Sequence, residues 1–577
     1  MRRFFVGLFA VVGFVFILSM VGLIGATYWI SHRAGPSAAI PERTVLIVDL
    51  RESYSEADGF SPLDYFQDGA SMNVSDLVLA VDAAAQDDRV VGLFVRLAET
   101  DHGFAKAQEM IAALSRFRES GKPAVGWADS IGELGSGNEG YMIASALDEI
   151  HVQPGGMVGL TGLSVEMPFA RDLLDRIGVE PAVVRRAEYK TMLDNASHSG
   201  FSDAHREMME DLLDSLYGQL LATIAKGRLI PVEELGALVD RGPFTADQAL
   251  DLELIDGIEH HRPTFEQFLE RMDGPDILDI GEYSHLLDVE GEEDDATREG
   301  VQVALLRTEG NVVRGDEDLS ENVAGDTLAD SIREAVDDED IAAIILRLDT
   351  GGGSAIASET IAFEIRSALE DGKPVIISMG NLAASGGYWI AMGASRIVAQ
   401  PGTLTGSIGV IAGKPVIAGL SASLGVNWER IERGANADLF SLAEPFDSNG
   451  MRAMNGMLDD IYNRFIAGVA EGRELEEEYV AQIARGRVWT GEQAIEIGLV
   501  DRLGGIPEAI DEARIALELD EEEAVRIVPW PRPLSSLERL QQLLDDQLGQ
   551  FGEFVLVWNR LRSSVFGTVQ MPAFTIR

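Results

Sequence analysis

The chain has 577 residues, of which 96 are Asp or Glu and 46 are Lys or Arg, so its formal net charge is −50. So acidic a chain argues against nucleic acid as a partner, because phosphate binding requires clustered cations. The absence of cysteine excludes disulfides, thiolate catalysis and cysteine metal sites. A hydrophobic content of 46% is typical of folded domains, and we interpret the excess acid as a solvated surface.

The N-terminal segment is the first predicted element. Two arginines precede an uncharged, mostly apolar run from Phe4 to Ile30. This run exceeds the roughly 20 residues that a spanning helix needs, which favours a retained anchor over a signal peptide cleaved after Ala26. The arginines favour a cytoplasmic N-terminus. We therefore predict a single-pass membrane anchor at 1–33, with the rest of the chain outside the cytoplasm.

An internal duplication follows. The segment from about 45 to 258 reappears, diverged, from about 301 to 506, and its middle part keeps one offset of 247 positions, as between Gly140 and Gly387. In both copies apolar strands alternate with amphipathic helical stretches, the pattern of an α/β domain with a mainly parallel sheet. The predicted strands include Val45–Asp49, Val90–Arg96, Val301–Leu306 and Ile341–Leu348.

These patterns predict a domain order along the chain. We assign one α/β domain to 45–275 and a second to 300–530. The run of acids at 288–295 predicts a solvated linker over 276–299. Leucines at helical spacing, followed by aromatic and apolar residues, predict a helical and apolar tail over 531–577. Packing or oligomer contact is the simpler role for this tail, and lying on a bilayer surface is the alternative.

Positions that differ in reactive character between the copies carry the functional signal. Ser385 lies among alanines and glycines in the second copy, where the first copy has Asn138. Small neighbours let a substrate backbone approach, and the amide after a serine can point at a developing oxyanion. A serine in such a turn can also be purely structural, so this motif alone decides nothing.

A lysine supplies the complementary signal. Lys190 lies in the first copy, and the offset maps it onto Ala437 of the second. An ion pair with neighbouring acids is its structural alternative, although the whole chain has only six lysines. None of the eight histidines lies in the second copy, whereas a lysine neutralised by burial can serve as a base. A Ser–Lys dyad is therefore the simpler assignment.

Two further features fit such a site. Ser407 stands where the first copy has Leu160, and its hydroxyl could hold a neutral lysine in position, although it could also serve only its own turn. A glycine turn at 351–353 directly follows the predicted strand that ends at Leu348, where open α/β sheets place their sites. A phosphate-binding loop is excluded there, because no Gly-Lys-Ser/Thr follows.

The motifs at 379–389, 404–409 and 488–491 closely resemble the signal peptide peptidase A family, the long bacterial form within peptidase family S49. The resemblance covers nearly the whole chain. It implies tandem ClpP/crotonase-like domains. The reaction that it implies requires no metal or cofactor.

The resemblance also implies the site. Ser385 would be the nucleophile, Lys190 the general base, Ser407 the residue that orients the lysine, and Gly352 and Gly386 the oxyanion amides. One departure from the family pattern is a Thr-Gly-Gly-Gly turn at 350–353 in place of Ser-Pro-Gly-Gly, which removes a stiffening proline.

The resemblance implies a homotetrameric serine endopeptidase on the outer face of the inner membrane that degrades cleaved signal peptides and other hydrophobic peptides. Two alternatives stay open from the residues. One is a crotonase-like acyl-CoA enzyme, because that fold also holds an oxyanion with glycine-turn amides. The other is a catalytically silent membrane scaffold of the same fold.

Overall fold

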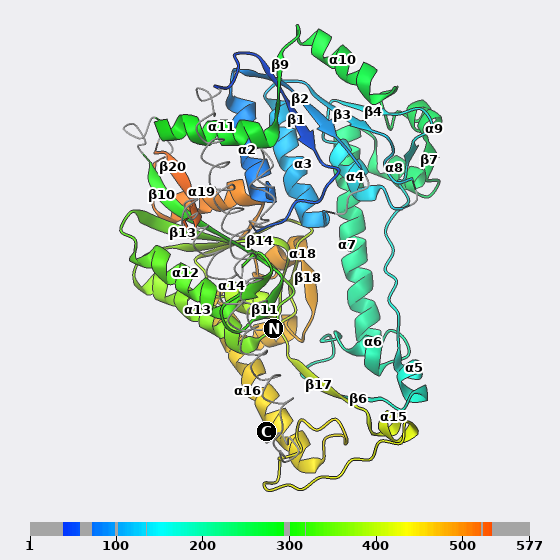
Figure 1. Cartoon of the computed structure of the whole chain (residues 1–577), viewed down its shortest axis with the longest axis vertical. Helices are drawn as coiled ribbons and strands as arrows, with labels where there is room; N and C mark the ends of the chain where they lie inside the picture. Colours follow the sequence, from blue (N-terminus) through cyan, green and yellow to red (C-terminus); the bar gives the residue numbers. More distant parts are fainter. Residues whose placement is uncertain are drawn as a thin grey trace, which may run out of the picture.

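The computed structural model describes residues 39–532 apart from 58–71, 99–101, 134, 294–299, 318 and 521–522. The predicted anchor at 1–33 and all but the first two residues of the predicted tail at 531–577 therefore lie outside the described residues. Among the described residues, none of the helices is both long enough and apolar enough to cross a membrane. The chain forms two α/β units, and Figure 1 shows the first above the second.

The first unit is built on a six-stranded sheet in the order β8-β4-β3-β2-β1-β9, and all of its strand pairs are parallel. Its central strands are near-continuous apolar runs because helices cover both faces. Its elements are β1 (Thr44–Asp49), α2 (Val74–Gln86), β2 (Val90–Arg96), α3 (Phe104–Glu119), β3 (Ala124–Ala128), α4 (Asn138–Ala144), β4 (Glu149–Val152), β5 (Met157–Val158), α5 (Arg171–Arg176), β6 (Glu180–Arg185), α6 (Asp194–Ser197), α7 (Asp203–Arg228), α8 (Val232–Val239), β7 (Phe244–Thr245), α9 (Ala246–Asp251), β8 (Gly257–Ile258), α10 (His261–Arg271), β9 (Asp276–Asp279) and α11 (Ile280–Glu293).

The second unit has an eight-stranded sheet in the order β18-β16-β14-β13-β10-β20, to which β15 and β19 are added beside β14. Its elements are β10 (Val301–Glu309), β11 (Asn311–Val313), β12 (Asn322–Ala324), α12 (Gly325–Asp337), β13 (Ile341–Thr350), α13 (Ala355–Glu370), β14 (Val375–Ala384), α14 (Gly386–Ala391), β15 (Arg396–Ala399), β16 (Leu404–Gly406), β17 (Ile411–Val416), α15 (Ala418–Ser423), α16 (Ser448–Gly472), α17 (Glu477–Ile483), β18 (Val488–Thr490), α18 (Gly491–Glu496), β19 (Arg502–Leu503), α19 (Ile506–Ala516) and β20 (Val525–Trp530). The four strands predicted above are confirmed as β1, β2, β10 and β13.

The duplication is visible in the topology and in matching side-chain contacts. The order β8-β4-β3-β2-β1-β9 of the first sheet is repeated in the second as β19-β15-β14-β13-β10-β20. The hydroxyl of Tyr141 donates to the Leu254 carbonyl, as that of Tyr388 does to the Leu499 carbonyl. Each unit is therefore a diverged copy of one α/β ancestor.

The predicted linker at 276–299 is wrong over most of its length. Residues 276–279 form β9, which pairs in parallel with β1, and residues 280–293 form helix α11. Tyr283 and Leu286 of this helix are buried in the core of the first unit. Because Ile280, Tyr283 and Leu286 recur at helical spacing and are buried, they anchor the segment. Glu290 adds an ion pair with Arg89, at 3.0 Å. The strand is the counterpart of β20 in the second sheet.

A two-stranded antiparallel ribbon joins the units at a distance from both sheets. Strand β6 of the first unit pairs with β17 of the second along their whole lengths. In Figure 1 helix α7 runs from the first unit down past the second, toward the end of the molecule where this ribbon lies. Lys190 lies in the segment between β6 and α7, which contacts the second unit.

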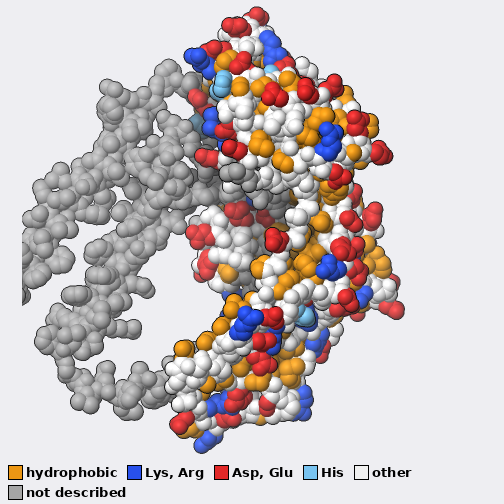
Figure 2. Space-filling model, turned by 90° about the vertical axis from the view of Figure 1, so that its right-hand side faces the viewer, with side chains coloured by type: hydrophobic (Ala, Val, Ile, Leu, Met, Phe, Trp, Pro, Cys, Tyr) orange, Lys and Arg blue, Asp and Glu red, His pale blue; other side chains and the backbone are white. Residues whose placement is uncertain are grey.

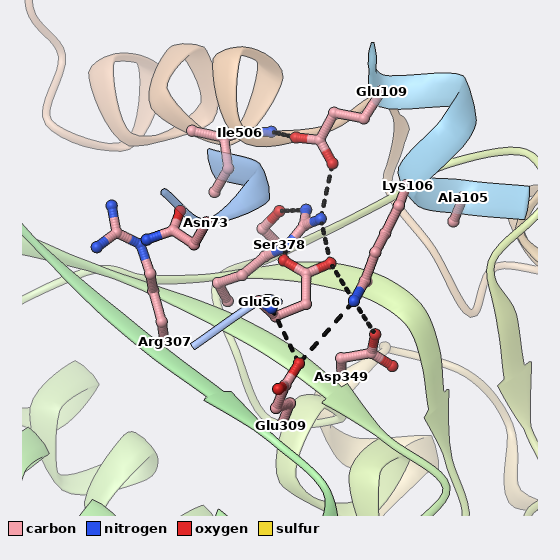
Figure 3. A network of polar contacts seen from close by, with 12 residues as sticks. Glu56, Asn73, Ala105, Lys106, Glu109, Arg307, Glu309, Asp349, Ser378 and Ile506 are labelled. Atoms are coloured by element: carbon pink, nitrogen blue, oxygen red, sulfur yellow. Dashed lines mark hydrogen bonds and ion pairs between the residues drawn. The ribbon is translucent and has the colours of Figure 1, made fainter. Parts of the chain in front are cut away.

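A buried ionic cluster around Arg347 of β13 lies where the two units meet. The Arg347 guanidinium is fully buried and donates to Glu56 at 2.8 and 2.9 Å and to Glu109 at 2.7 Å, both from the first unit. It also donates to Ser378 Oγ at 2.9 Å. Figure 3 shows these carboxylates together with Lys106 of α3. Losing one partner would leave an uncompensated buried charge, so the cluster fixes the relative position of the units.

Acidic side chains are spread over the face of the molecule that Figure 2 shows. They lie at both ends of this face and are not gathered into one patch. This distribution agrees with the interpretation of the net charge as a solvated surface.

Candidate active site

The site is centred on Ser385, at a sharp turn between β14 and helix α14. Ser385 has φ 54° and ψ −114°, a backbone conformation that residues other than glycine rarely adopt. Its neighbours must be small: a Cβ added to Gly386 would lie 2.7 Å from Ser358 Oγ, and one added to Gly387 would lie 2.6 Å from the Thr350 side chain. The two glycines after the serine are therefore explained by packing at the turn.

Lys190 reaches this serine from the first unit. Its Nζ lies 2.9 Å from Ser385 Oγ, 2.9 Å from Ser407 Oγ and 2.8 Å from the Ser407 carbonyl oxygen. The Lys190 side chain is only 5% exposed. Burial lowers the pKa of this amine from 10.5 to about 7, because the charged form loses its hydration. The ion pair considered as the alternative role for Lys190 is absent among the described residues.

Ser407 is brought to the site by the strand pairing that also holds Ser385. Strands β14 and β16 are parallel neighbours, and Ser385 N–H donates to the Gly406 carbonyl at 2.9 Å. Ser407 N–H donates to the Arg487 carbonyl at 2.7 Å, which fixes the turn after β16. The two serines are thus held together in one ladder of the second unit, and Lys190 approaches them from outside it.

The loop carrying Lys190 is held by contacts that the sequence did not reveal. Arg185 donates to the Lys190 carbonyl at 3.2 Å and pairs with the fully buried Asp194 at 2.6 Å. Gly486 passes so close that a Cβ there would lie 2.6 Å from Lys190 N and 2.7 Å from Lys190 Cβ. Tyr189 N–H also donates to the Arg485 carbonyl at 3.1 Å. Both units therefore fix the position of the lysine backbone.

The two predicted oxyanion donors lie side by side beside Ser385. A Cβ added to Gly352, which has φ +97°, would lie 2.5 Å from Gly386 N and 2.9 Å from Ser385 Cβ. Gly386 is the first residue of helix α14, so its N–H has no acceptor within the helix. Gly352 N–H donates to Thr350 Oγ1 at 3.1 Å. The Gly386 N–H therefore has no partner within α14, whereas the Gly352 N–H is already bonded to Thr350.

The glycine turn is stiffened without the proline of the family pattern. Val312 of β11 donates its N–H to the Gly352 carbonyl at 3.1 Å, and its own carbonyl accepts from Ser354 N–H at 2.9 Å. A Cβ on Gly353 would lie 2.2 Å from that Val312 carbonyl oxygen. Pairing with β11 therefore holds the turn in place, a contact distant enough in sequence to escape motif reading.

The equivalent place in the first unit has no matching chemistry. Asn138, the counterpart of Ser385, accepts from Thr161 N–H at 2.9 Å and donates to the Gly162 carbonyl at 2.7 Å. It thus closes a turn at the position where the second unit has its serine. Ala437, the counterpart of Lys190, lies in an exposed loop. Each chain therefore has one such Ser–Lys arrangement within the described residues. Over the same ranges, no group of three or more His, Asp or Glu side chains is placed to hold a metal ion.

Comparison with known proteins finds a family and relatives whose matches extend over both units. The family described as "Peptidase family S49" matches residues 116–274 and 367–520, one segment in each unit and together more than half of the chain. "Protease 4" of Haemophilus influenzae is 29% identical over 537 residues, covering 89% of this chain and 85% of that protein. "Protease 4" of Salmonella typhi is 31% identical over 85% of this chain and 81% of its own length.

A plant relative extends the comparison. "Serine protease SPPA, chloroplastic" of Arabidopsis thaliana is 30% identical over 79% of this chain and 67% of its own length. The fold and these matches define an α/β serine peptidase with a duplicated domain. The chain belongs to peptidase family S49.

Proposed function

We propose that the chain is an endopeptidase with a Ser–Lys dyad, in which Ser385 is the nucleophile and Lys190 the general base. The observation that carries this proposal is the 2.9 Å separation between Lys190 Nζ and Ser385 Oγ at a buried position. A neutral amine has two N–H groups and one lone pair. If the Ser407 carbonyl and hydroxyl oxygens accept the two N–H groups, the lone pair faces the Ser385 hydroxyl.

The reaction then follows from the positions of these groups. Lys190 takes the Ser385 proton as Oγ attacks the scissile carbonyl carbon, and the Gly386 and Gly352 amides stabilise the oxyanion. The lysine ammonium protonates the leaving amine as the C–N bond breaks and an acyl-enzyme forms. Lys190 next takes a proton from water, whose oxygen attacks the ester carbonyl carbon. When the C–O bond breaks, the proton returns to Ser385.

An acylating serine probe tests the assignment. We expect a fluorophosphonate to label the full chain, and both Ser385→Ala and Lys190→Ala to abolish labelling. Ser145→Ala is a matched control, because Ser145 is buried but its hydroxyl donates only to the Met142 carbonyl. Unchanged labelling in both dyad variants would refute the proposal, and absence of labelling in the parent chain would favour the catalytically silent scaffold.

We further propose where and on what the enzyme acts. The apolar run from Phe4 to Ile30 supports a single-pass anchor in the inner membrane with the catalytic units outside the cytoplasm. The resemblance to the signal peptide peptidase A family supports leftover signal peptides and other hydrophobic peptides as substrates, ClpP/crotonase-like folds for both units, and a homotetramer. Sedimentation of the chain without residues 1–33 tests the assembly, because a monomer mass would contradict it.

A further inference from the structure

Strand β14 contains a bulge, residues 380–382, shortly before the nucleophile. On its β13 side, the single residue Asp349 faces these three residues, because the register shifts there. Before the bulge β14 pairs with β15, and from its last residue onward it pairs with β16. The β14–β16 ladder that follows ends at Ala384 and Gly406, and Ser385 and Ser407 are the next residues of the two strands. The way in which the bulge is held therefore sets the position of both serines.

The second unit holds the bulge through Asp349. Its carboxylate accepts from Asn381 N–H at 3.3 Å and from Leu382 N–H at 2.9 Å. Lys106 of the first unit places its Nζ 3.6 Å from the same carboxylate. Figure 3 shows Lys106 pointing from α3 toward Asp349 and Glu309. The bulge is thus linked electrostatically to the first unit.

Asn381 makes a second, direct link between the units. Its Oδ1 accepts from the N–H groups of Ala105 at 3.0 Å and Lys106 at 3.1 Å, in the first turn of α3. Its Nδ2 donates to the His102 carbonyl at 2.8 Å. The residue at the N-cap position of α3 is Gly103, which has no side chain to cap the helix. Asn381 therefore caps this helix from the other half of the chain.

We propose that Asn381 is a positioning residue for proteolysis: by capping α3 of the first unit, it sets the place of Ser385 and Ser407 relative to Lys190. This inference rests on the proposed dyad. Lys190 belongs to the first unit and the two serines to the second, so productive geometry depends on contacts that hold the units in register. Asn381 is such a contact, four residues before the nucleophile.

The kinetics of Asn381→Ala in the full chain test whether Asn381 positions the dyad or only stabilises helix α3. Asp447→Ala is the matched control, because Asp447 caps α16 through the amides of Asn449, at 3.0 Å, and Gly450, at 2.7 Å, so this cap lies within the second unit and does not link the two units. We expect Asn381→Ala to lower kcat at least tenfold with KM changed less than twofold, and Asp447→Ala to leave both within twofold. The thermal midpoints of the two variants should fall by similar amounts.

A conservative variant completes the test. Asn381→Asp keeps the acceptor for the two α3 amides, so we expect it to recover kcat at least threefold above Asn381→Ala. A kcat of Asn381→Ala within twofold of the parent, or an equal loss in Asp447→Ala, would overturn the inference. Ser385→Ala is measured beside them: a parent no more active than this variant would end the proposed function and the inference together, whereas an active parent with unaffected Asn381→Ala would overturn the inference alone.

Discussion

The burial of Lys190 makes a quantitative prediction about the pH dependence of catalysis. Burial lowers the pKa of this amine from 10.5 to about 7, a preference for the neutral form of about 5 kcal/mol. The amine is then about half neutral at pH 7, whereas an exposed lysine would be neutral in only about 0.03% of molecules. The buried site therefore provides over a thousandfold more base at neutral pH, by the same relation.

The direction of the pH dependence follows from which protonation form of Lys190 is active. Only the neutral amine can take the Ser385 proton, so kcat/KM should rise with pH through 7 and level off above about 8. At pH 5 the neutral fraction is about 1%, and kcat/KM should fall to about one hundredth of its plateau. The assay is hydrolysis of a fluorogenic apolar peptide from pH 4.5 to 10. Lys190→Arg should lose at least about a thousandfold at every pH, because a guanidinium stays charged.

Lys414→Met is the matched control for this profile. Lys414 is 9% exposed and donates to the Leu439 carbonyl at 3.0 Å, away from the dyad. Its replacement should leave the midpoint of the acidic limb unchanged. A parental midpoint above pH 9, or a Lys190→Arg variant within tenfold of the parent, would refute the reasoning that burial prepares Lys190 as the base.

Two further predictions concern the contacts that hold the site together. Gly486→Ala should lower kcat/KM at least tenfold in the peptide assay, because the added Cβ would lie 2.6 Å from Lys190 N at a residue with φ +78°; unchanged activity would show that the lysine loop tolerates displacement. Arg347→Met should lower the free energy of unfolding by about 3–5 kcal/mol in urea, since it removes the only guanidinium bonded to the buried Glu109 among the described residues and leaves Glu56 with only the longer contact to Lys106, at 3.9 Å. A loss below about 1 kcal/mol would contradict the role of this cluster.

The predicted fold follows the sequence where signals are local. The strand Val90–Arg96 is an apolar run bounded by polar residues, and the structure begins and ends it at the same positions. The linker prediction for 276–299 is wrong because the run of acids at 288–295 is a strong local signal, whereas the apolar residues Ile280, Tyr283 and Leu286 that bury the segment are widely spaced. Sequence pattern identifies such a helix only when apolar spacing is weighed above local charge.

Three features of the site were available from the sequence alone. Comparison of the two copies singled out Ser385, Lys190 and Ser407 as positions where only one copy has a reactive side chain. Two copies of one fold share their structural residues, so a difference in reactive character between them indicates candidate chemistry.

Tertiary structure alone decided the contacts between these residues. The order of residues in the chain does not reveal that Lys190 Nζ lies 2.9 Å from Ser385 Oγ or that Lys190 is buried. The same holds for Asn381, whose amide caps a helix 275 and 276 positions away in the chain. Distance and burial depend on how the two units pack together. The pKa of Lys190 and its distance from Ser385 are therefore properties of the assembled fold, whereas the candidate reacting groups can be proposed from the sequence.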